Sequence, residues 1–340
     1  MTGGTVLKPQ SESLESPKAG AVPKVSVSRQ SFGQQYGSLL ALVALILFNA
    51  IFTRYFLSVQ TLNVNFTQVA TTVIVACGMT LVIGTGGIDL SVGSLMAISG
   101  AIAPMLFMNQ SLPPALGVGL AFVLPVLVAG AFGLFNGFLI TRYAIQSIIA
   151  TLVLFIAGRG IAQVMTNGNL QTFSNQAFQF IGKGRPLSLP FQVLLMLALV
   201  ALIAWVVRAT TFGRYLLATG GNEAASKLAG VPVTRVKLAV YGISGLLSGI
   251  AGLIVIAINS SSDANQVGLN MELDAIAAVA VGGTSLSGGQ VNVVGTLIGA
   301  LIIQLIRYTL LSKGIPDAIA LVVKAVIIVV AVYAQRGRQA

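Results

Sequence analysis

One acidic residue stands among apolar segments of the chain, where a carboxylate is unusual. Asp89 follows Gly86-Gly87-Ile88 and precedes the helical run that begins with Leu90-Ser91-Val92. A charged side chain inside a membrane protein is by default a candidate functional residue. Asp is also a favoured N-cap residue, so the alternative is a structural cap for the following helix, and the sequence favours this cap. On the cap interpretation, the substitution Asp89→Ser is expected to be mild.

Further polar side chains interrupt apolar segments and could line a path for a polyhydroxyl solute. Arg159 lies well inside one such segment, where it could snorkel outward, pair with a carboxylate or contact a polar substrate. Amide side chains on apolar helices more often form hydrogen bonds between helices. The candidates for gating or for the substrate path are the glycines of two turns and selected polar residues: Gly86, Gly87, Asp89, Ser91, Asn65, Gln68, Asn136, Arg159, Gly282, Gly283, Ser285 and Gln304.

The chain lacks the residues of common catalytic and nucleotide-binding sites. It has no histidine, which removes the commonest metal ligand and proton shuttle. Its single cysteine, Cys77, lies in an apolar run and cannot form an internal disulfide. No Walker A phosphate-binding pattern occurs. We therefore expect no catalytic residue, no metal and no cofactor in this chain.

Composition predicts an all-α polytopic membrane protein. Of 340 residues, 56% are hydrophobic and only 8% are charged, and the mean hydropathy is +0.92. A soluble domain carries roughly 25% charged residues. Because a membrane span needs about 20 apolar residues, the sequence predicts about ten transmembrane helices, the eighth short enough to be a half-helix. They are expected at 37–56, 62–85, 88–108, 115–140, 145–165, 190–207, 236–258, 273–282, 291–311 and 316–334.

The distribution of basic residues predicts the orientation. Residues 1–35 are polar and contain no apolar core, so we expect a disordered cytoplasmic tail rather than a signal peptide, followed by a transmembrane domain at 36–336. With this tail inside, most of the 19 Lys and Arg residues face the cytoplasm, in agreement with the positive-inside rule. Both termini are then cytoplasmic. The segment 259–272 faces outward and is acidic, with Asp263, Glu272 and Asp274 in or beside it.

An internal repeat relates the two halves of the membrane domain. The motif Gly86-Gly87-Ile88-Asp89-Leu90-Ser91-Val92-Gly93 aligns with Gly282-Gly283-Thr284-Ser285-Leu286-Ser287-Gly288-Gly289, 196 residues later. Ser285 then occupies the position of Asp89 and is also a favoured N-cap residue. Internal repeats recur in transporter folds, with the transport path at their interface. The span count makes the two copies parallel, unless a glycine turn at mid-membrane reverses one of them.

A polar segment at 208–237 separates the apolar stretches and encodes one short helix. Asn222 is the expected N-cap, and Glu223 suits the positive end of the helix dipole. Gly230 is the expected left-handed residue after the helix, and Pro232 blocks its continuation. A helix of two turns is marginal in isolation, so it must dock on something. The residues leave two surfaces open, the protein's own membrane face and a cytoplasmic partner.

Several of these stretches occur together in one known family. Gly78-Met79-Thr80-Leu81-Val82-Ile83 precedes the first glycine motif, and Glu272-Leu273-Asp274-Ala275-Ile276-Ala277 precedes the second. Gly220-Gly221-Asn222 with Ala224-Ala225 lies between them. Over about residues 36–336, the chain resembles the ribose/monosaccharide-type permeases of ABC importers. Asp263-Ala264-Asn265 and Ala157-Gly158-Arg159-Gly160 look closest to the galactofuranose-type branch.

The resemblance implies a permease subunit, not an enzyme, that imports a pentose or hexose across the bacterial inner membrane. It implies a second permease chain, identical or related, and an ATPase subunit inside that binds ATP and Mg. It also implies a soluble sugar-binding protein outside, contact with membrane lipid, and no nucleic acid. The short helix becomes the ATPase-coupling helix, with Asn222, Glu223, Ala224, Ala225, Ser226, Lys227 and Gly230 as coupling residues.

Two details of the resemblance concern its interfaces. The interval from Ala225 to Gly230 is one residue longer than in many other importer permeases, so contacts in those systems do not transfer residue by residue. The candidate docking residues for the sugar-binding protein are the acidic group Asp263, Glu272 and Asp274.

Two other functions are compatible with the residues alone. A self-contained secondary sugar transporter could use Asp89 with Lys324 or Arg159 as coupling charges, and its uptake would collapse with the ion gradient while ATP persists. A passive channel would conduct solute without any energy source. Neither alternative accounts for a capped two-turn helix on the cytoplasmic side.

Overall fold

The computed structural model describes residues 32–336, which form α-helices joined by short turns and one two-stranded ribbon. The first half contains α1 (Phe32–Phe52), α2 (Val59–Gly84), α3 (Val92–Phe107), α4 (Pro114–Arg142), α5 (Ser147–Met165), β1 (Gln171–Thr172), α6 (Gln176–Lys183), a 3-10 turn (Pro186–Ser188) and α7 (Phe191–Ala209). The second half contains α8 (Thr211–Gly221), α9 (Glu223–Leu228), α10 (Val233–Asn259), β2 (Ser261–Ser262), α11 (Met271–Val281), α12 (Val293–Ser312) and α13 (Asp317–Arg336).

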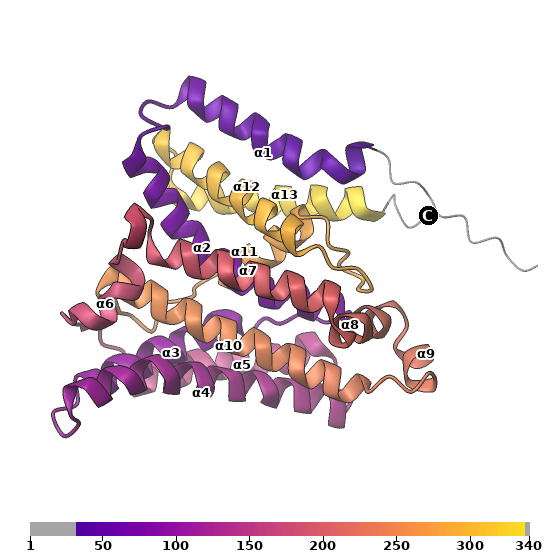
Figure 1. Cartoon of the computed structure of the whole chain (residues 1–340), viewed down its shortest axis with the longest axis horizontal. Helices are drawn as coiled ribbons and strands as arrows, with labels where there is room; N and C mark the ends of the chain where they lie inside the picture. The colour runs from indigo at the N-terminus through magenta and orange to yellow at the C-terminus, as the bar shows by residue number, and fades with distance from the viewer. Residues whose placement is uncertain (1–31, 337–340) are drawn as a thin grey trace, which may run out of the picture.

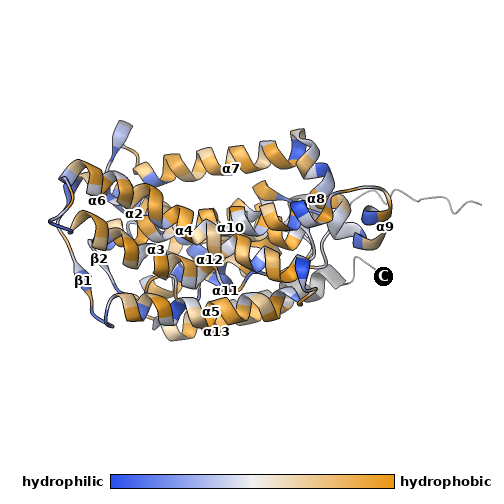
Figure 2. Ribbon diagram, turned by 90° about the horizontal axis from the view of Figure 1, so that it is seen from below, coloured by the Kyte–Doolittle hydropathy of each residue, from blue (hydrophilic) through white to orange (hydrophobic). Residues whose placement is uncertain are grey.

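The long helices run side by side, and the short elements collect at the two ends of the bundle (Figures 1 and 2). We call one end the α9 end, because α8 and α9 lie there, and the other the α6 end, where α6 and the antiparallel pair β1–β2 lie. The first described turn of α1 and the last of α13 are both at the α9 end (Figure 1). The two ends therefore differ in the elements that they present.

Helix α2 forms the centre of the core, because nearly every residue in its second half is buried. Helix α10 packs against α2, α3 and α4. Glycines permit this packing, since a Cβ at Gly245 would overlap the carbonyl oxygen of Ala129 and one at Gly252 would meet the carbonyl oxygen of Met96 at 2.5 Å. The Gly/Ser-rich stretch of α10 thus allows close contact between helices.

The prediction of an all-α polytopic membrane protein is confirmed in its general form. Among residues 32–336, six helices are long and apolar enough to cross a membrane: α2, α4, α5, α7, α10 and α12. Shorter apolar helices lie at Gly37–Phe52, Val92–Phe107 and Ala318–Ile327. All ten expected spans coincide with a helix, and the eighth, α11, is the predicted short one with 11 residues.

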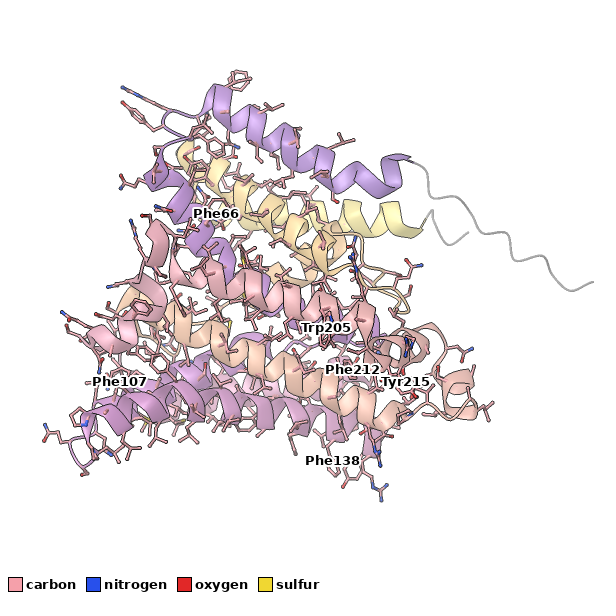
Figure 3. The ribbon with its side chains drawn as sticks, viewed as in Figure 1. Phe66, Phe107, Phe138, Trp205, Phe212 and Tyr215 are labelled. Atoms are coloured by element: carbon pink, nitrogen blue, oxygen red, sulfur yellow. The ribbon has the colours of Figure 1, made fainter. Side chains whose placement is uncertain are left out.

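Aromatic side chains mark both ends of the bundle. Trp205, Phe212 and Tyr215 lie towards the α9 end, and Phe66 lies towards the α6 end (Figure 3). The Trp205 side chain is exposed. Aromatic side chains at the two ends of a helix bundle are typical of membrane–water interfaces.

Three features of the fold differ from the sequence expectation or lie beyond it. Residues 1–31 of the expected tail lie outside the described residues, and α1 begins at Phe32. Helices α6 and α8 were not predicted. The ring of Phe178 in α6 lies 4.9 Å from that of Phe107 and 5.2 Å from that of Phe122, measured between ring centroids, so aromatic packing anchors α6.

The two glycine turns have different lengths, which corrects the register of the repeat. Helix α2 ends at Gly84 and α11 at Val281, so the helix ends are 197 residues apart rather than 196. The turn before α3 spans 85–91, whereas the turn before α12 spans 282–292 and is four residues longer. Ser285 is therefore not an N-cap. Asn292 caps α12 instead, and its side chain accepts a hydrogen bond from the backbone N–H of Gly295 at 2.9 Å.

The two turns meet α8 at a cluster that we call the glycine junction: Gly84, Gly86, Gly220, Gly288 and Gly289. The backbone N–H of Gly289 donates to the carbonyl oxygen of Gly84 at 3.0 Å. A Cβ at Gly220 would overlap that carbonyl oxygen, and one at Gly288 would lie 2.8 Å from the backbone nitrogen of Gly86. Gly86, Gly288 and Gly289 also have positive φ angles, which glycine adopts without strain. Backbone contacts backbone here, without intervening side chains.

The glycine junction predicts that Gly220 tolerates substitution by alanine less well than its neighbour Gly221 does. Gly220→Ala should lower the apparent melting temperature of the chain in detergent, because overpacking against backbone costs about 1–3 kcal/mol. A Cβ at Gly221 has nothing within 4 Å, so Gly221→Ala is the matched control and should cause no loss. Equal melting temperatures for the two variants would contradict the proposed close packing.

Candidate functional site

Asp89 lies at the centre of a fully buried hydrogen-bond network in the turn between α2 and α3. One carboxylate oxygen accepts the backbone N–H of Ser91 at 3.0 Å and the Ser91 hydroxyl at 2.6 Å. The other oxygen accepts the hydroxyl of Ser244 on α10 at 2.8 Å. The predicted N-cap role is wrong, because Ser91 is the N-cap residue of α3 and Asp89 closes the turn before it.

The network extends from this turn to α4. The Asn136 amide nitrogen donates to the Ser91 hydroxyl oxygen at 3.0 Å, so three of the predicted gating residues, Asp89, Ser91 and Asn136, lie together. The Asn136 amide oxygen is buried and has no hydrogen-bond partner among the described residues. The network therefore fixes the position of the turn 85–91 relative to α4 and α10.

Hydroxyl groups of α5 pair with the backbone of the same turn. The N–H of Ile88 donates to the Ser147 hydroxyl oxygen at 3.3 Å, and the N–H of Leu90 donates to the Thr151 hydroxyl oxygen at 3.1 Å. The turn thus obtains from side chains the hydrogen bonds that a continuous helix would supply internally.

A second polar group joins α2 and α12. The Gln304 amide nitrogen donates to the side-chain oxygens of Gln68 at 2.8 Å and Asn65 at 3.3 Å. Gln68 and Gln304 line a cavity of about 430 Å³, which we call the outer cavity. Its other lining residues come from α2, α10, α11, α12 and the segment before α11: Thr71, Thr72, Val255, Ile258, Asn259, Gln266, Leu269, Met271, Asp274, Ala300, Ile303 and Arg307.

Arg159 holds the chain segment that leads into α11. Its guanidinium donates to the carbonyl oxygen of Ala264 at 2.8 Å and to that of Val267 at 2.6 Å. The Gln163 amide nitrogen, one turn further along α5, donates to the Asn265 side-chain oxygen at 2.8 Å. Of the roles left open for Arg159, a structural contact with this segment is the one observed, although its acceptors are backbone carbonyls rather than a carboxylate.

The predicted acidic docking surface is wrong for one of its three residues. Glu272 is only 6% exposed, so it cannot contribute to a surface. The Asp263 carboxylate is half-buried and accepts the backbone N–H of Asn265 at 2.8 Å. Asp274 is half-buried in the wall of the outer cavity. Asp263, Glu272 and Asp274 therefore do not form one exposed acidic patch.

Helix α9 has the predicted caps at both ends. The Asn222 side chain accepts the backbone N–H of Ala225 at 2.9 Å. Beyond the C-terminus, Gly230 has a φ angle of +78°, and the N–H of Val231 returns to the carbonyl oxygen of Ser226 at 3.0 Å. These bonds satisfy groups that a six-residue helix leaves without internal partners.

Two lysines bind Glu223 and hold α9 against α10. Its carboxylate lies 2.8 Å from Lys227 Nζ on the same helix and 2.6 Å from Lys237 Nζ on α10. Partial burial disfavours the charged carboxylate, but the hydrogen bonds and charges of Lys227 and Lys237 outweigh it and lower the pKa of Glu223. The contacts are therefore present at neutral pH and are lost only as pH falls through that lowered value.

The far side of α9 is unpartnered in this chain. Leu228 is 92% exposed, the highest value among the large apolar side chains described. Ala224 and Ala225 lie on the same short helix, and Ser226 is its one buried residue. The sequence left two docking surfaces open for α9, the protein itself and a partner. Lys237 on α10 binds α9 to the protein, and Leu228 on the other side of α9 is free for a partner.

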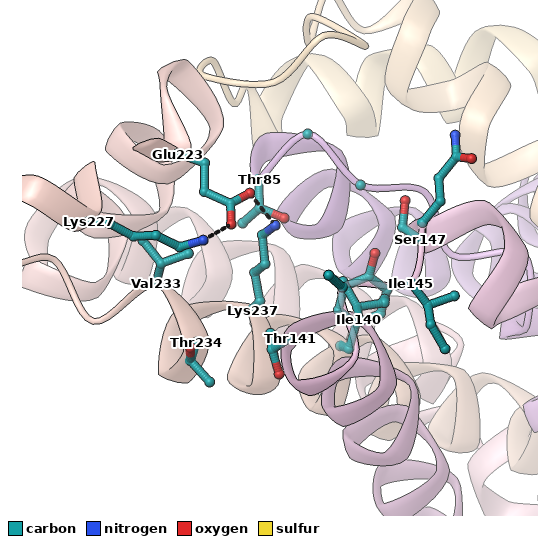
Figure 4. A pocket seen from close by; sticks show the side chains of 15 residues that line it. Thr85, Ile140, Thr141, Ile145, Ser147, Glu223, Lys227, Val233, Thr234 and Lys237 are labelled. Atoms are coloured by element: carbon teal, nitrogen blue, oxygen red, sulfur yellow. Dashed lines mark hydrogen bonds and ion pairs between the residues drawn. The ribbon is translucent and has the colours of Figure 1, made fainter. Parts of the chain in front are cut away.

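Gly86 and Gly87 line a cavity of about 320 Å³ at the α9 end, which we call the inner cavity (Figure 4). Glu223, Lys227 and Lys237 form part of its wall. The other glycine turn, with Gly282, Gly283 and Ser285, does not line it. Of the predicted path residues, Gln68 and Gln304 line the outer cavity, and Gly86 and Gly87 line the inner cavity. Asp89, Ser91 and Asn136 form the buried network. The other predicted path residues line neither cavity: Asn65, Arg159, Gly282, Gly283 and Ser285.

Sequence reasoning missed several residues of these sites. Tyr241 and Ser244 lie on α10, far along the chain from the first glycine turn, and nothing in the sequence pairs Ser244 with Asp89 or places Tyr241 in the inner cavity. Lys237 appeared only as the end of a polar segment. Leu228 did carry a signal, because it is a large apolar residue within a short polar helix.

The Asp89 network predicts a strong dependence on the carboxylate. Asp89→Ala and Asp89→Ser should both lower the apparent melting temperature, because neither reaches Ser244 and each buried group left unpaired costs about 1–3 kcal/mol. The matched control is Ser285→Ala, at the position that the sequence motif aligns with Asp89; the Ser285 hydroxyl pairs with Ser287 in an exposed setting. It should change stability by less than about 0.5 kcal/mol. A mild Asp89→Ser variant would restore the cap interpretation.

Comparison with known proteins places the chain in a family. A family model described as "Branched-chain amino acid transport system / permease component" matches residues 62–332. No solved structure matches the chain.

Curated relatives match over most of their length. The chain is 41% identical to the ribose import permease protein RbsC of Escherichia coli K12 over 307 residues, which is 89% of this chain and 94% of the relative. It is 42% identical to the galactofuranose transporter permease protein YtfT of the same organism over 276 residues, 80% of this chain and 78% of the relative. For the fructose import permease protein FruF of Bifidobacterium longum the identity is 35% over 292 residues, 82% of this chain and 81% of the relative. The chain therefore belongs to the family of ABC transporter permease components that this model describes.

Proposed function

We propose that this chain is the permease subunit of an ATP-driven importer that carries a monosaccharide into the cytoplasm. Membership of the permease family implies a multi-pass protein of the inner membrane that acts with an ATPase and a substrate-binding partner. The relatives named for ribose, galactofuranose, fructose and L-arabinose favour a sugar as the substrate. The observation that carries the proposal is α9, a helix capped at both ends that presents an exposed leucine.

The outer cavity supports a sugar rather than a branched-chain amino acid. A branched aliphatic side chain would need a mainly apolar pocket, whereas amide and hydroxyl groups can donate to and accept from sugar hydroxyls. Such groups are supplied to this cavity by Gln68, Thr71, Thr72, Asn259, Gln266 and Gln304. Asp274 and Arg307 also line it, and each already interacts within the protein. We propose that the sugar enters at the α6 end and passes this cavity.

The orientation follows from the charges at the α9 end. The helices there carry Arg142, Arg208, Arg214, Lys227, Arg235 and Lys237, and an excess of basic residues marks the cytoplasmic side of membrane proteins. The first described turn of α1 and the last of α13 lie at the same end (Figure 1). We propose ten membrane crossings with both termini in the cytoplasm.

In this orientation α9 is the coupling helix. Leu228 and the neighbouring face of α9 would fill a groove of the ATPase subunit, which binds ATP and Mg. The coupling set comprises Asn222, Glu223, Ala224, Ala225, Ser226, Lys227 and Gly230, of which Ser226 is buried and acts by packing. A soluble sugar-binding protein would dock at the α6 end near Asp263, and a second permease chain would complete the complex.

The glycine junction supplies a route from α9 to the transport path. Helix α8 ends at Gly221, next to the Asn222 cap of α9, and Gly220 contacts Gly84 at the end of α2 and Gly289 in the turn before α12. Gly288 of that turn contacts Gly86 in the turn before α3. Because backbone meets backbone there, displacement of α8 by the ATPase would move the turn before α12 directly and the turn before α3 through Gly84 and Gly288. One of these turns carries the Asp89 network. We propose that ATP-driven movement of α9 opens and closes the path by this contact.

Truncation of one exposed side chain tests the coupling role. Leu228→Ala should weaken co-purification of the ATPase subunit roughly tenfold, because a buried apolar anchor at an interface contributes more than about 1 kcal/mol. Insertion and thermal stability of the chain should be unchanged, since Leu228 contacts little within it. Sugar uptake should fall in parallel.

A matched control separates coupling from a general surface effect. Val294→Ala truncates another exposed apolar side chain at the α9 end, on α12 outside the coupling helix, and should leave ATPase recovery unchanged. Normal ATPase recovery and uptake in Leu228→Ala would overturn the coupling assignment. An active preparation that contains no ATPase subunit would instead overturn the ATP-driven mechanism.

A further inference from the structure

The inner cavity is bounded by elements that the proposed mechanism moves relative to one another. Its walls come from the turn at 85–87, the end of α4, the start of α5, helix α9 and the start of α10 (Figure 4). The cavity has a volume of about 320 Å³, at the lower end of the roughly 300–1,000 Å³ found for small-molecule sites. It lies at the end of the bundle opposite the α6 end.

One buried hydroxyl group in its wall has no partner. Tyr241 on α10 is 1% exposed, and its Oη makes no hydrogen bond among the described residues. The Ser147 hydroxyl lies beside Oη in the same wall, but the two groups lack the geometry of a formed hydrogen bond, so Oη keeps its capacity to bind a ligand. A Cβ at Gly87 would overlap Oη, so the absence of a side chain there leaves the phenol its space. A buried unpaired hydroxyl costs about 1–3 kcal/mol, which a ligand hydrogen bond would recover.

The rest of the lining is suited to hydroxyl groups. Thr85, Thr141, Ser147 and Thr234 contribute hydroxyls and Gln146 a side-chain amide, and these groups can both donate and accept hydrogen bonds. The apolar lining residues are Ile140, Ala144, Ile145 and Val233, which offer surface to the C–H face of a small ring. A polyhydroxyl molecule with an apolar face matches both kinds of surface.

The charged groups of the wall favour an uncharged ligand. Lys227 and Lys237 both bind the Glu223 carboxylate, at 2.8 and 2.6 Å, so each lysine already has an anionic partner, although one positive charge remains in excess. An anionic ligand would have to compete with that carboxylate for the lysines. A neutral molecule can accept from their remaining N–H donors without breaking either pair.

We propose that the inner cavity is a binding site for a neutral monosaccharide, with Tyr241 Oη as a hydrogen-bonding anchor. The proposal rests on the sugar-import function proposed above and assigns a second sugar site, distinct from the outer cavity. Because Glu223 and Lys227 belong to α9, a sugar in this site touches the coupling helix directly. The transported sugar is thereby in contact with α9 before it leaves the protein.

Protection from thiol labelling tests the site in the purified full chain. Thr234→Cys places an exposed thiol at the cavity wall, whereas Cys77 is fully buried, so the unsubstituted chain serves as the labelling blank. D-Ribose, L-arabinose, D-fructose and D-galactose are the probes, and at least one should slow maleimide labelling of Thr234→Cys saturably. Calorimetric titration of the unsubstituted chain with the same sugars provides a second measurement that needs no variant.

The substitution Tyr241→Phe, which removes only Oη, tests whether Tyr241 is the hydrogen-bonding anchor. Tyr241→Phe in the Thr234→Cys background should weaken the protecting sugar roughly tenfold, which corresponds to about 1.4 kcal/mol. The control Tyr308→Phe alters a tyrosine of α12 that packs on Phe56 and does not line the inner cavity, so it should leave protection unchanged. Equal protection in Tyr241→Phe and Tyr308→Phe would remove Tyr241 from the site.

Two results would overturn the proposed sugar site in the inner cavity. Absence of protection and of calorimetric binding for all four sugars would overturn the inner site. Protection by inorganic phosphate but by no sugar would also overturn it, in favour of an anion site. These binding measurements do not depend on ATP or on uptake, so a failure of ATP-driven sugar uptake would contradict the proposed function without altering their result.

Discussion

Backbone N–H and C=O groups that are buried away from water must find partners within the protein, and the two turns that follow α2 and α11 depend on this constraint. In the turn before α3, Ser147 and Thr151 of α5 accept the N–H groups of Ile88 and Leu90, and Asp89 accepts that of Ser91. In the turn before α12, the N–H of Gly289 is accepted by the carbonyl oxygen of Gly84. Irregular backbone is therefore possible only where neighbouring helices surround it.

This requirement links the turns to each other and to the helix that leads into α9. Backbone can pair with backbone across elements only at close approach, and glycine at Gly84, Gly220 and Gly289 permits that approach. Rigid packing at such a contact transmits a displacement rather than absorbing it. The hydrogen-bonding constraint thus has a mechanical consequence, because α8, the helix next to α9, is in backbone contact with the end of α2 and with the turn before α12.

The same arrangement separates two polar cavities. The outer cavity is lined by Gln68 and Gln304, and the inner cavity by Tyr241 and the pair Glu223–Lys237, while the Asp89 network lies buried as a separate cluster. A transporter must expose its substrate to one side at a time. Polar groups at both ends of the bundle with a closed, hydrogen-bonded segment in its interior are consistent with that requirement.

The sequence by itself determined the elements whose signals are local. Apolar runs of sufficient length predicted every long helix, and Asn222 with Gly230 predicted both ends of α9, because capping depends on residues within a few positions of the helix end. Only the tertiary structure decided which distant polar groups meet. Asp89 pairs with Ser244, which lies 155 residues away, and Arg159 binds carbonyl groups more than 100 residues away, since packing in three dimensions selects these partners and no local pattern encodes them. The same packing buried Glu272, which the sequence had placed on a surface.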